Sequence, residues 1–105
     1  MKILFDQGTP VPLRAALIGH TIETAYERGW STLSNGDLLT AAEDASFDVL
    51  ITTDQNLPGE QTLSGRRLAV VVLPTTDWRQ IREHTGDVVA ELKSVQRGQH
   101  RTVVW

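Results

Sequence analysis

Short apolar runs alternate along the chain with longer polar segments that carry helical spacing or turn residues. Runs of neighbouring apolar residues, or strict alternation of apolar and polar residues, are typical of β-strands. Such segments lie at residues 2–5, 20–25, 48–53, 66–74 and 100–105, the last as a strand or an ordered tail. We therefore expect up to five short strands, of which the segment at 66–74 is the most hydrophobic.

Two of the segments between these strands carry clear helix signals. Residues 9–19 begin with Thr9 as a candidate N-cap and continue with two prolines, which the first turn of a helix tolerates. Residues 35–47 repeat apolar side chains at helical spacing, behind a cap at Ser34 or Asn35. Both segments are therefore predicted to be helices.

The second half of the chain completes the alternation. Residues 56–65 are irregular, with at most one short helical turn, and residues 76–98 form one helix or two helices broken at Gly86. Near-continuous apolar strands that alternate with helices predict a parallel sheet covered on both faces. The 105 residues fit one small domain, so the predicted fold class is α/β, with a single domain over residues 1–105.

Composition narrows the class of protein. Hydrophobic content of 40% and charged content of 22% are those of a folded globular domain rather than a disordered chain. The absence of cysteine excludes disulfides, zinc–thiolate sites and thiol catalysis. No apolar stretch approaches the roughly 20 residues of a membrane span, and Asp6 comes too early for the apolar region of a signal peptide. A cytoplasmic protein without a membrane partner is therefore expected.

Charge is unevenly distributed along the chain. Residues 1–60 carry nine acidic and three basic side chains, whereas residues 61–105 carry seven basic and four acidic ones. This asymmetry favours either a metal site beside an anion-binding surface or ordinary solvated faces of unequal charge. The net charge of −3 argues weakly against a protein that coats nucleic acid in general.

Acidic residues stand where predicted strands end. Asp6 and Asp54 each follow the carboxyl end of an apolar strand, and Asp37 opens the helix that leads into the strand before Asp54. Ligands of open parallel sheets bind outside the carboxyl ends of the strands, at the switch point of the strand order. If the first and third strands are neighbours, Asp6, Asp37 and Asp54 share one edge of the domain.

Three carboxylates at one edge favour a cation between them. Neighbouring carboxylates repel each other, and several hard oxygen ligands suit Mg²⁺ or Mn²⁺. Such an ion lowers the pKa of bound water and holds a phosphate oxygen, which is the chemistry of phosphodiester hydrolysis. Each acid also has a purely structural interpretation, as a turn residue, a helix cap or a first-turn acid that satisfies the helix dipole.

Other polar residues have secondary roles in this hypothesis. Gln7 and Asn56 are candidates to contact the site or its metal-bound water, and Thr53 is a candidate to orient Asp54, although turn and strand preferences explain them too. Arg14 is a candidate phosphate contact, with a solvated helix face as its alternative. Glu43 lies about 9 Å along the helix from Asp37, too far to share an ion. The scattered histidines form neither a zinc motif nor a Ser–His–Asp pattern.

Four stretches together resemble one known family. The chain over about residues 2–73 is similar to the PIN-like domain family labelled DUF5615, a compact branch of the PIN nuclease superfamily. The resemblance rests on the early strand-end acid, the helix-start acid and the turn after the third strand, within the segments KILFDQGTPVPLRAAL, GHTIETAYERGW, NGDLLTAAEDASFDVLITTDQNL and LSGRRLAVVVL.

The resemblance implies both a fold and an activity. It implies a Rossmann-like, three-layer α/β/α sandwich with a central, mainly parallel sheet, and a ribonuclease that depends on Mg²⁺ or Mn²⁺. Asp6, Asp37 and Asp54 match the family's acids. Asn56 stands where the family often has a further acid, and Gln7 stands where it often has Glu or Asn, so this chain has fewer acids than the pattern.

Three functions follow as hypotheses. The leading one is a metal-dependent ribonuclease that cleaves single-stranded RNA, as the toxin of a toxin–antitoxin pair with a cognate antitoxin protein as partner. The second is a catalytically inactive PIN-like binding or regulatory module. The third is a phosphatase or phosphate-binding protein on a similar sheet. Residues 74–105 lie outside the strongest match and are candidates for homodimer or partner contacts.

Overall fold

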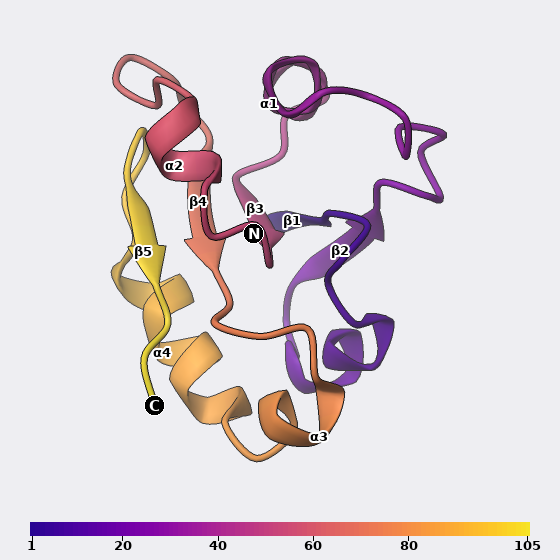
Figure 1. Ribbon diagram of the computed structural model, residues 1–105, viewed down its shortest axis with the longest axis vertical. Helices are drawn as coiled ribbons and strands as arrows, with labels where there is room; N and C mark the ends of the chain where they lie inside the picture. The colour runs from indigo at the N-terminus through magenta and orange to yellow at the C-terminus, as the bar shows by residue number, and fades with distance from the viewer.

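Five parallel strands form the centre of the computed structural model, which describes all residues from 1 to 105 (Figure 1). The sheet has the order β2-β1-β3-β4-β5, and every neighbouring pair is parallel. Its strands are β1 (Lys2–Phe5), β2 (Thr21–Thr24), β3 (Val49–Thr52), β4 (Ala69–Val72) and β5 (His100–Thr102). The prediction of an α/β domain built on a parallel sheet is therefore confirmed.

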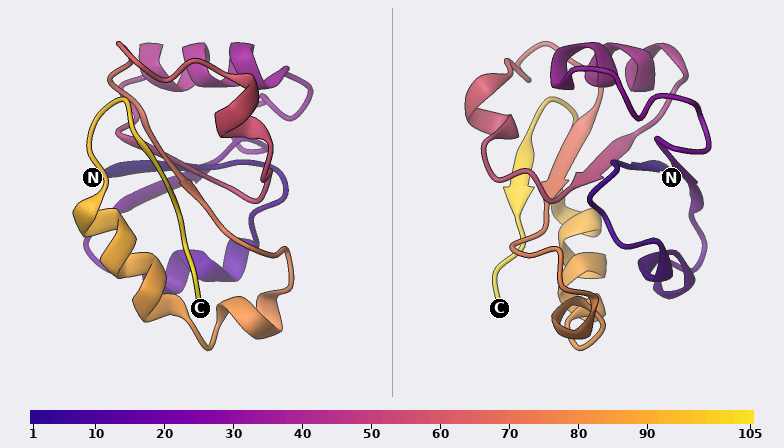
Figure 2. Two further views of the ribbon diagram at one scale, coloured as in Figure 1. Left: turned by 60° about the vertical axis from the view of Figure 1, so that its left-hand side comes forward. Right: turned by 45° about the vertical axis from the view of Figure 1, so that its right-hand side comes forward.

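Helices cover both faces of the sheet, which makes three layers (Figure 2). Because successive side chains of a strand point to opposite faces, Ile3 and Phe5 enter one core and Leu4 enters the other. One face is covered by α1 (Asn35–Asp44) and α2 (Leu57–Glu60), and the other by η1 (Val11–Ala16), α3 (Trp78–Ile81) and α4 (Thr85–Ser94). None of the helices is long and apolar enough to cross a membrane.

The segment at 9–19 differs from the expected α-helix. It forms a six-residue 3₁₀-helix, η1, with Pro10 at its N-cap position and no side-chain cap. Thr9 therefore does not cap it, because its hydroxyl lies 3.1 Å from Asp6 Oδ1 and 2.9 Å from the Ile51 carbonyl oxygen. Two prolines without N–H groups near the start of the segment also suit a short, tight helix.

The segment at 76–98 forms two helices, but the break does not lie at Gly86. The chain leaves α3 after Ile81 and turns through residues 82–84, and Gly86 lies in the first turn of α4. A glycine is tolerated there because the first N–H groups of a helix have no intrahelical partner in any case. Asp77 caps α3 by accepting the Arg79 N–H at 2.9 Å.

Helix α1 is fixed at both ends. Ser34 is its N-cap and accepts the Asp37 N–H at 3.3 Å, which settles the two alternatives for this cap. At the other end Phe47 N–H bonds the Ala42 carbonyl at 2.9 Å and Ser46 N–H bonds the Glu43 carbonyl at 3.0 Å. This is the Schellman arrangement, with a serine at the left-handed position that glycine usually occupies. It directs the chain into β3.

Candidate functional site

The strand order places the switch point of the sheet between β1 and β3. The chain moves from β1 to β2 on one side and then crosses back to β3 on the other side of β1. Connections on either side of this point diverge, which leaves room for a ligand beyond the strand ends. Asp6 directly follows β1, and Asp54 comes two residues after β3, so both carboxyl groups lie at this position.

Asp6 is held by hydrogen bonds on both carboxyl oxygens. Oδ1 accepts the Gly8 N–H at 3.1 Å and lies 3.1 Å from the Thr9 hydroxyl, while Oδ2 accepts the Thr52 hydroxyl in a short contact. The Gly8 bond closes a tight turn after β1, which explains why the chain changes direction there. Asp6 is thus fixed in place rather than free to rotate.

Asp54 is anchored by the start of α1. Its Oδ2 accepts the side-chain amide of Asn35 at 3.0 Å, and its Oδ1 accepts the Asn56 N–H at 2.9 Å. The first bond shows that the N-terminal end of α1 lies at the carboxyl edge of the sheet, as expected for a crossover helix. The second bond forms an Asx-turn. Asp54 is therefore both a turn residue and a carboxylate of the candidate site.

Thr52 connects the two acids. Its side chain is fully buried, and its hydroxyl donates to Asp6 Oδ2 while accepting the Asp54 N–H at 3.0 Å. The only buried polar residues of the protein are Thr9, Thr24 and Thr52, and two of them contact Asp6. Buried polar groups are concentrated where a carboxylate must be positioned rather than spread through the core.

The surroundings of Asp6 disfavour its charged form. Burial raises the pKa of the Asp6 carboxyl above its ordinary value of 3.8, against the lowering effect of hydrogen bonds from Thr52, Thr9 and Gly8. The nearby Asp54 carboxylate raises this pKa further, by a smaller effect. A cation beside the pair would remove this repulsion and stabilise both ionised acids.

Asp37 does not complete a three-carboxylate group. Its side chain is exposed in the first turn of α1, and no three carboxylate or imidazole side chains of the protein gather closely enough to hold one ion. Helix α1 contributes Asn35 to the site instead. The remaining pair still fits Mg²⁺, which commonly takes one or two carboxylates and completes its shell with water and substrate phosphate. Asp6 and Asp54 keep free lone pairs for this role.

The turn after β1 brings Gly8 close to Thr53. A Cβ atom built at Gly8 would clash with Thr53 Oγ1, so a larger residue there would have to displace the Thr53 side chain. Thr53 therefore closes against the Asp6 turn, and no hydrogen bond of its side chain to Asp54 is present. The orienting hydroxyl predicted at Thr53 is supplied by its neighbour Thr52.

The other candidate residues lie at the edge of the site or away from it. Gln7 is exposed beside Asp6, and Asn56 contributes its backbone N–H rather than its side chain. Arg14 pairs with Glu27 and lines a hollow beside Asp6. Glu43 lies towards the far end of α1, where it accepts the Arg67 N–H at 2.8 Å, so its exclusion from the ion site agrees with its position.

Sequence reasoning did not single out Thr52, Thr9 or Asn35 as site residues. For Thr52 the visible signal was a threonine at the end of the strand, two residues before Asp54, and for Asn35 it was an amide at the start of the helix. The role of Thr52 depends on which hydroxyl of the Thr52–Thr53 pair lies beside Asp6, and this follows from the register in which Phe5 pairs with Ile51. The pattern of apolar residues does not specify it.

Two hollows open beside Asp6. The larger has a volume of about 300 Å³ and lies towards η1 and the end of β2. The smaller, of about 140 Å³, lies towards α1 and is lined in part by Trp30 and Asn35. Asp6 therefore lines both hollows.

Comparisons with protein families, characterised proteins and solved structures find no match to this chain.

Proposed function

We propose that this protein hydrolyses phosphodiester bonds of single-stranded RNA with Mg²⁺ or Mn²⁺, as a PIN-like ribonuclease. The observation that carries the proposal is the pair Asp6 and Asp54 at the β1/β3 switch point, joined through the buried hydroxyl of Thr52. The parallel sheet is compatible with the PIN-like resemblance of the sequence, which supplies the expectation of RNA as substrate. We extend the proposal to the toxin of a toxin–antitoxin pair.

In this mechanism the side chains hold the ion and keep its two carboxylate ligands in position. Asp6 and Asp54 would hold the ion, which when bound would supply an activated water and neutralise charge on the phosphate. Asn35, Thr52 and the Gly8 N–H keep the two carboxylates from rotating. Arg14 is less suited to holding phosphate than its position suggests, because Glu27 already occupies its guanidinium. The rate would be modest, because only two carboxylates support the ion.

A second candidate is a PIN-like binding or regulatory module without catalysis. The exposed position of Asp37 outside any three-acid group favours it. A two-carboxylate edge is able to bind an ion and a phosphate group without enough ligands to activate water at a useful rate.

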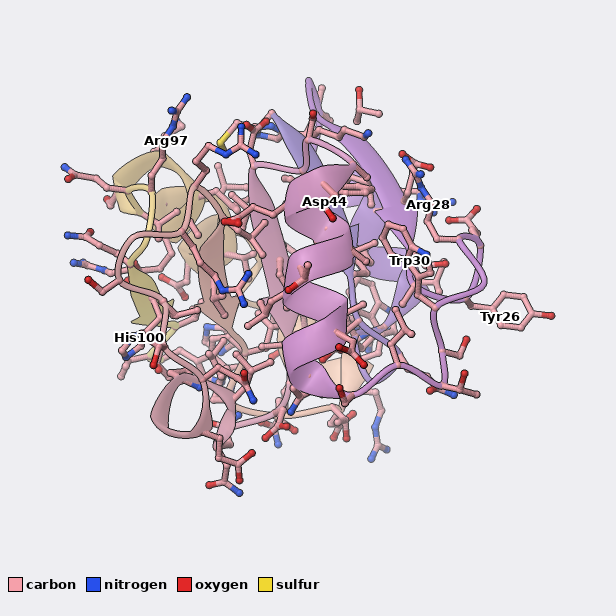
Figure 3. All side chains as sticks on the ribbon, turned by 90° about the horizontal axis from the view of Figure 1, so that it is seen from above. Tyr26, Arg28, Trp30, Asp44, Arg97 and His100 are labelled. Carbon is pink, nitrogen blue, oxygen red and sulfur yellow. The ribbon has the colours of Figure 1, made fainter.

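The test is an RNA cleavage assay. Purified protein with Mn²⁺ is mixed with end-labelled single-stranded RNAs, beside Asp6→Asn and Asp54→Asn. The matched control is Asp44→Asn, which changes an exposed acid at the far end of α1 (Figure 3). We expect slow cleavage that the control retains and that each site variant lowers by about 100-fold or more. A toxin would also arrest growth on expression, and Asp6→Asn would relieve the arrest.

Two outcomes would contradict the proposal. Equal cleavage by wild type and both site variants would assign the activity to a contaminant. No cleavage of any RNA with either metal would leave the binding module as the better account.

A further inference from the structure

Strand β2 ends the sheet with a free edge on the side away from β1 (Figure 1). The N–H groups of Thr21 and Ala25 bond carbonyl groups on the β1 side, at 3.0 and 2.8 Å. Because backbone direction alternates along a strand, Ile22 and Thr24 direct their N–H and C=O groups away from the sheet. Outward backbone groups of an edge strand are a template for pairing with another chain.

Only one residue of this edge keeps both backbone groups free. The N–H of Thr24 donates to Glu27 Oε1 at 2.9 Å, and its carbonyl oxygen accepts the Arg28 N–H at 3.1 Å. The N–H and C=O of Ile22 have no partner in the protein. In an antiparallel pair, two residues that lie opposite each other exchange both hydrogen bonds. The edge therefore fits a strand with one free residue of its own, which is the pattern of β2 itself.

Two strongly exposed apolar side chains flank β2 at equal distances from Ile22. Ile18, four residues before it, is 89% exposed, and Tyr26, four residues after it, is 79% exposed. The Tyr26 ring projects outward from the β2 side of the sheet (Figure 3). In an antiparallel pair centred on Ile22, residue 18 of one copy lies at the same end as residue 26 of the other, because each is four residues from the axis. The same apolar contact then occurs twice, as two-fold symmetry requires.

The charges along β2 permit this pairing. Thr21 would lie opposite Glu23 of the second copy, and Arg28 already holds Glu23 in a two-point ion pair at 2.9 and 3.1 Å. No like charges therefore face each other across the axis. The other edge strand, β5, carries His100 and Arg101, and basic residues of this kind protect an edge from pairing with its own copy.

We propose that β2 pairs antiparallel with β2 of a second copy of this chain, which gives a homodimer with Ile22 on its two-fold axis. The two Ile22 residues exchange both backbone hydrogen bonds, and Ile18 of each copy packs against Tyr26 of the other. This surface lies outside residues 74–105, and the dimer does not depend on the proposed ribonuclease activity. Because Tyr26 also lines the larger hollow beside Asp6, Ile18 of the second copy would border that hollow. The contact is small, so we expect a dissociation constant of about 10 to 100 µM.

Sedimentation equilibrium of the full chain, from about 10 µM to 1 mM, measures this association. We expect monomers and dimers and no larger species. Ile18→Glu and Tyr26→Lys, each first shown to be folded by circular dichroism, should each weaken the dimer about tenfold or more, because a charge then faces an apolar side chain at both contacts. A mixture of the two variants should associate more tightly than either alone, since the introduced carboxylate and ammonium groups face each other at one contact. Val104→Glu, which changes an exposed apolar residue beyond β5, should dimerise as wild type does.

Amide hydrogen exchange measured by NMR locates the contact. The Ile22 N–H should exchange about threefold more slowly at 1 mM than at 50 µM protein, and this dependence should disappear in Ile18→Glu. A wild type that stays monomeric up to about 1 mM would overturn the self-pairing and leave the β2 edge to an extended segment of a different protein. A dimer whose Ile22 exchange does not change with concentration, or that Ile18→Glu affects no more than Val104→Glu, would place the interface elsewhere. Larger oligomers would indicate a head-to-tail contact and refute the two-fold arrangement.

Discussion

The charged form of the Asp6 carboxyl group is subject to opposing effects, some of which stabilise it and some of which destabilise it. Its carboxyl is largely surrounded by protein, accepts from Gly8, Thr9 and Thr52, and faces the carboxylate of Asp54. Hydrogen bonds stabilise the charged form, whereas burial and repulsion oppose it, and the net effect on the pKa is upward. A residue selected only to cap a turn would not need a second acid beside it.

The raised pKa of Asp6 predicts a pH dependence of stability. Between the ordinary value of 3.8 and the higher folded-state value, the folded protein binds more protons than the unfolded chain, so this group lowers stability as pH rises through that window. Asp6→Asn removes the titration. In EDTA, the variant should therefore gain stability relative to wild type as the pH increases from about 3.5 to 7.

Urea unfolding of both proteins at several pH values measures this difference. Asp44→Asn, which changes an exposed acid, serves as the control. A difference that stays constant with pH, or that moves in favour of wild type as the pH rises, would contradict the account of Asp6.

Helix α1 links the candidate site to one layer of the fold. Apolar spacing and capping signals predicted the helix, and its buried Leu38, Leu39 and Ala42 explain its position on the sheet. The same reasoning failed at η1 and at the break after Ile81, because local hydrogen bonds of Thr9 and the turn at residues 82–84 decide those structures. Short elements depend on such contacts, which a periodic pattern does not encode.

The amide of Asn35 should matter for both stability and activity. Asn35→Ala removes a hydrogen bond to the Asp54 carboxylate and should cost about 1 to 2 kcal/mol, together with a loss of metal-dependent cleavage. Ser34→Ala, which removes the N-cap of the same helix, should cost about 1 kcal/mol and leave cleavage per folded molecule unchanged. Urea unfolding and the RNA assay on both variants separate the two roles. Equal activity of the two variants would show that Asn35 only supports the helix.

The uneven charge of the sequence becomes a division across the whole molecule. Residues 1–60, which have an excess of acidic side chains, form the consecutive strands β2, β1 and β3. Residues 61–105, which have an excess of basic side chains, form β4 and β5 at the opposite edge of the sheet. The sequence predicts the parallel sheet, and it predicts that Asp6 and Asp54 meet if the first and third strands are neighbours, which the strand order shows them to be. It could not predict that Asp37 stays outside or that Thr52 joins the pair, because these depend on side-chain direction.

The most direct test of the site is a calorimetric titration with Mn²⁺ of wild type, Asp54→Asn and the exposed control Asp44→Asn, each first shown to be folded by circular dichroism. If Asp6 and Asp54 hold one ion together, wild type and control should bind Mn²⁺ with the same affinity. Asp54→Asn should bind at least about tenfold more weakly, because a ligand is lost. Identical titrations of wild type and Asp54→Asn would contradict a shared cation site at the β1/β3 edge.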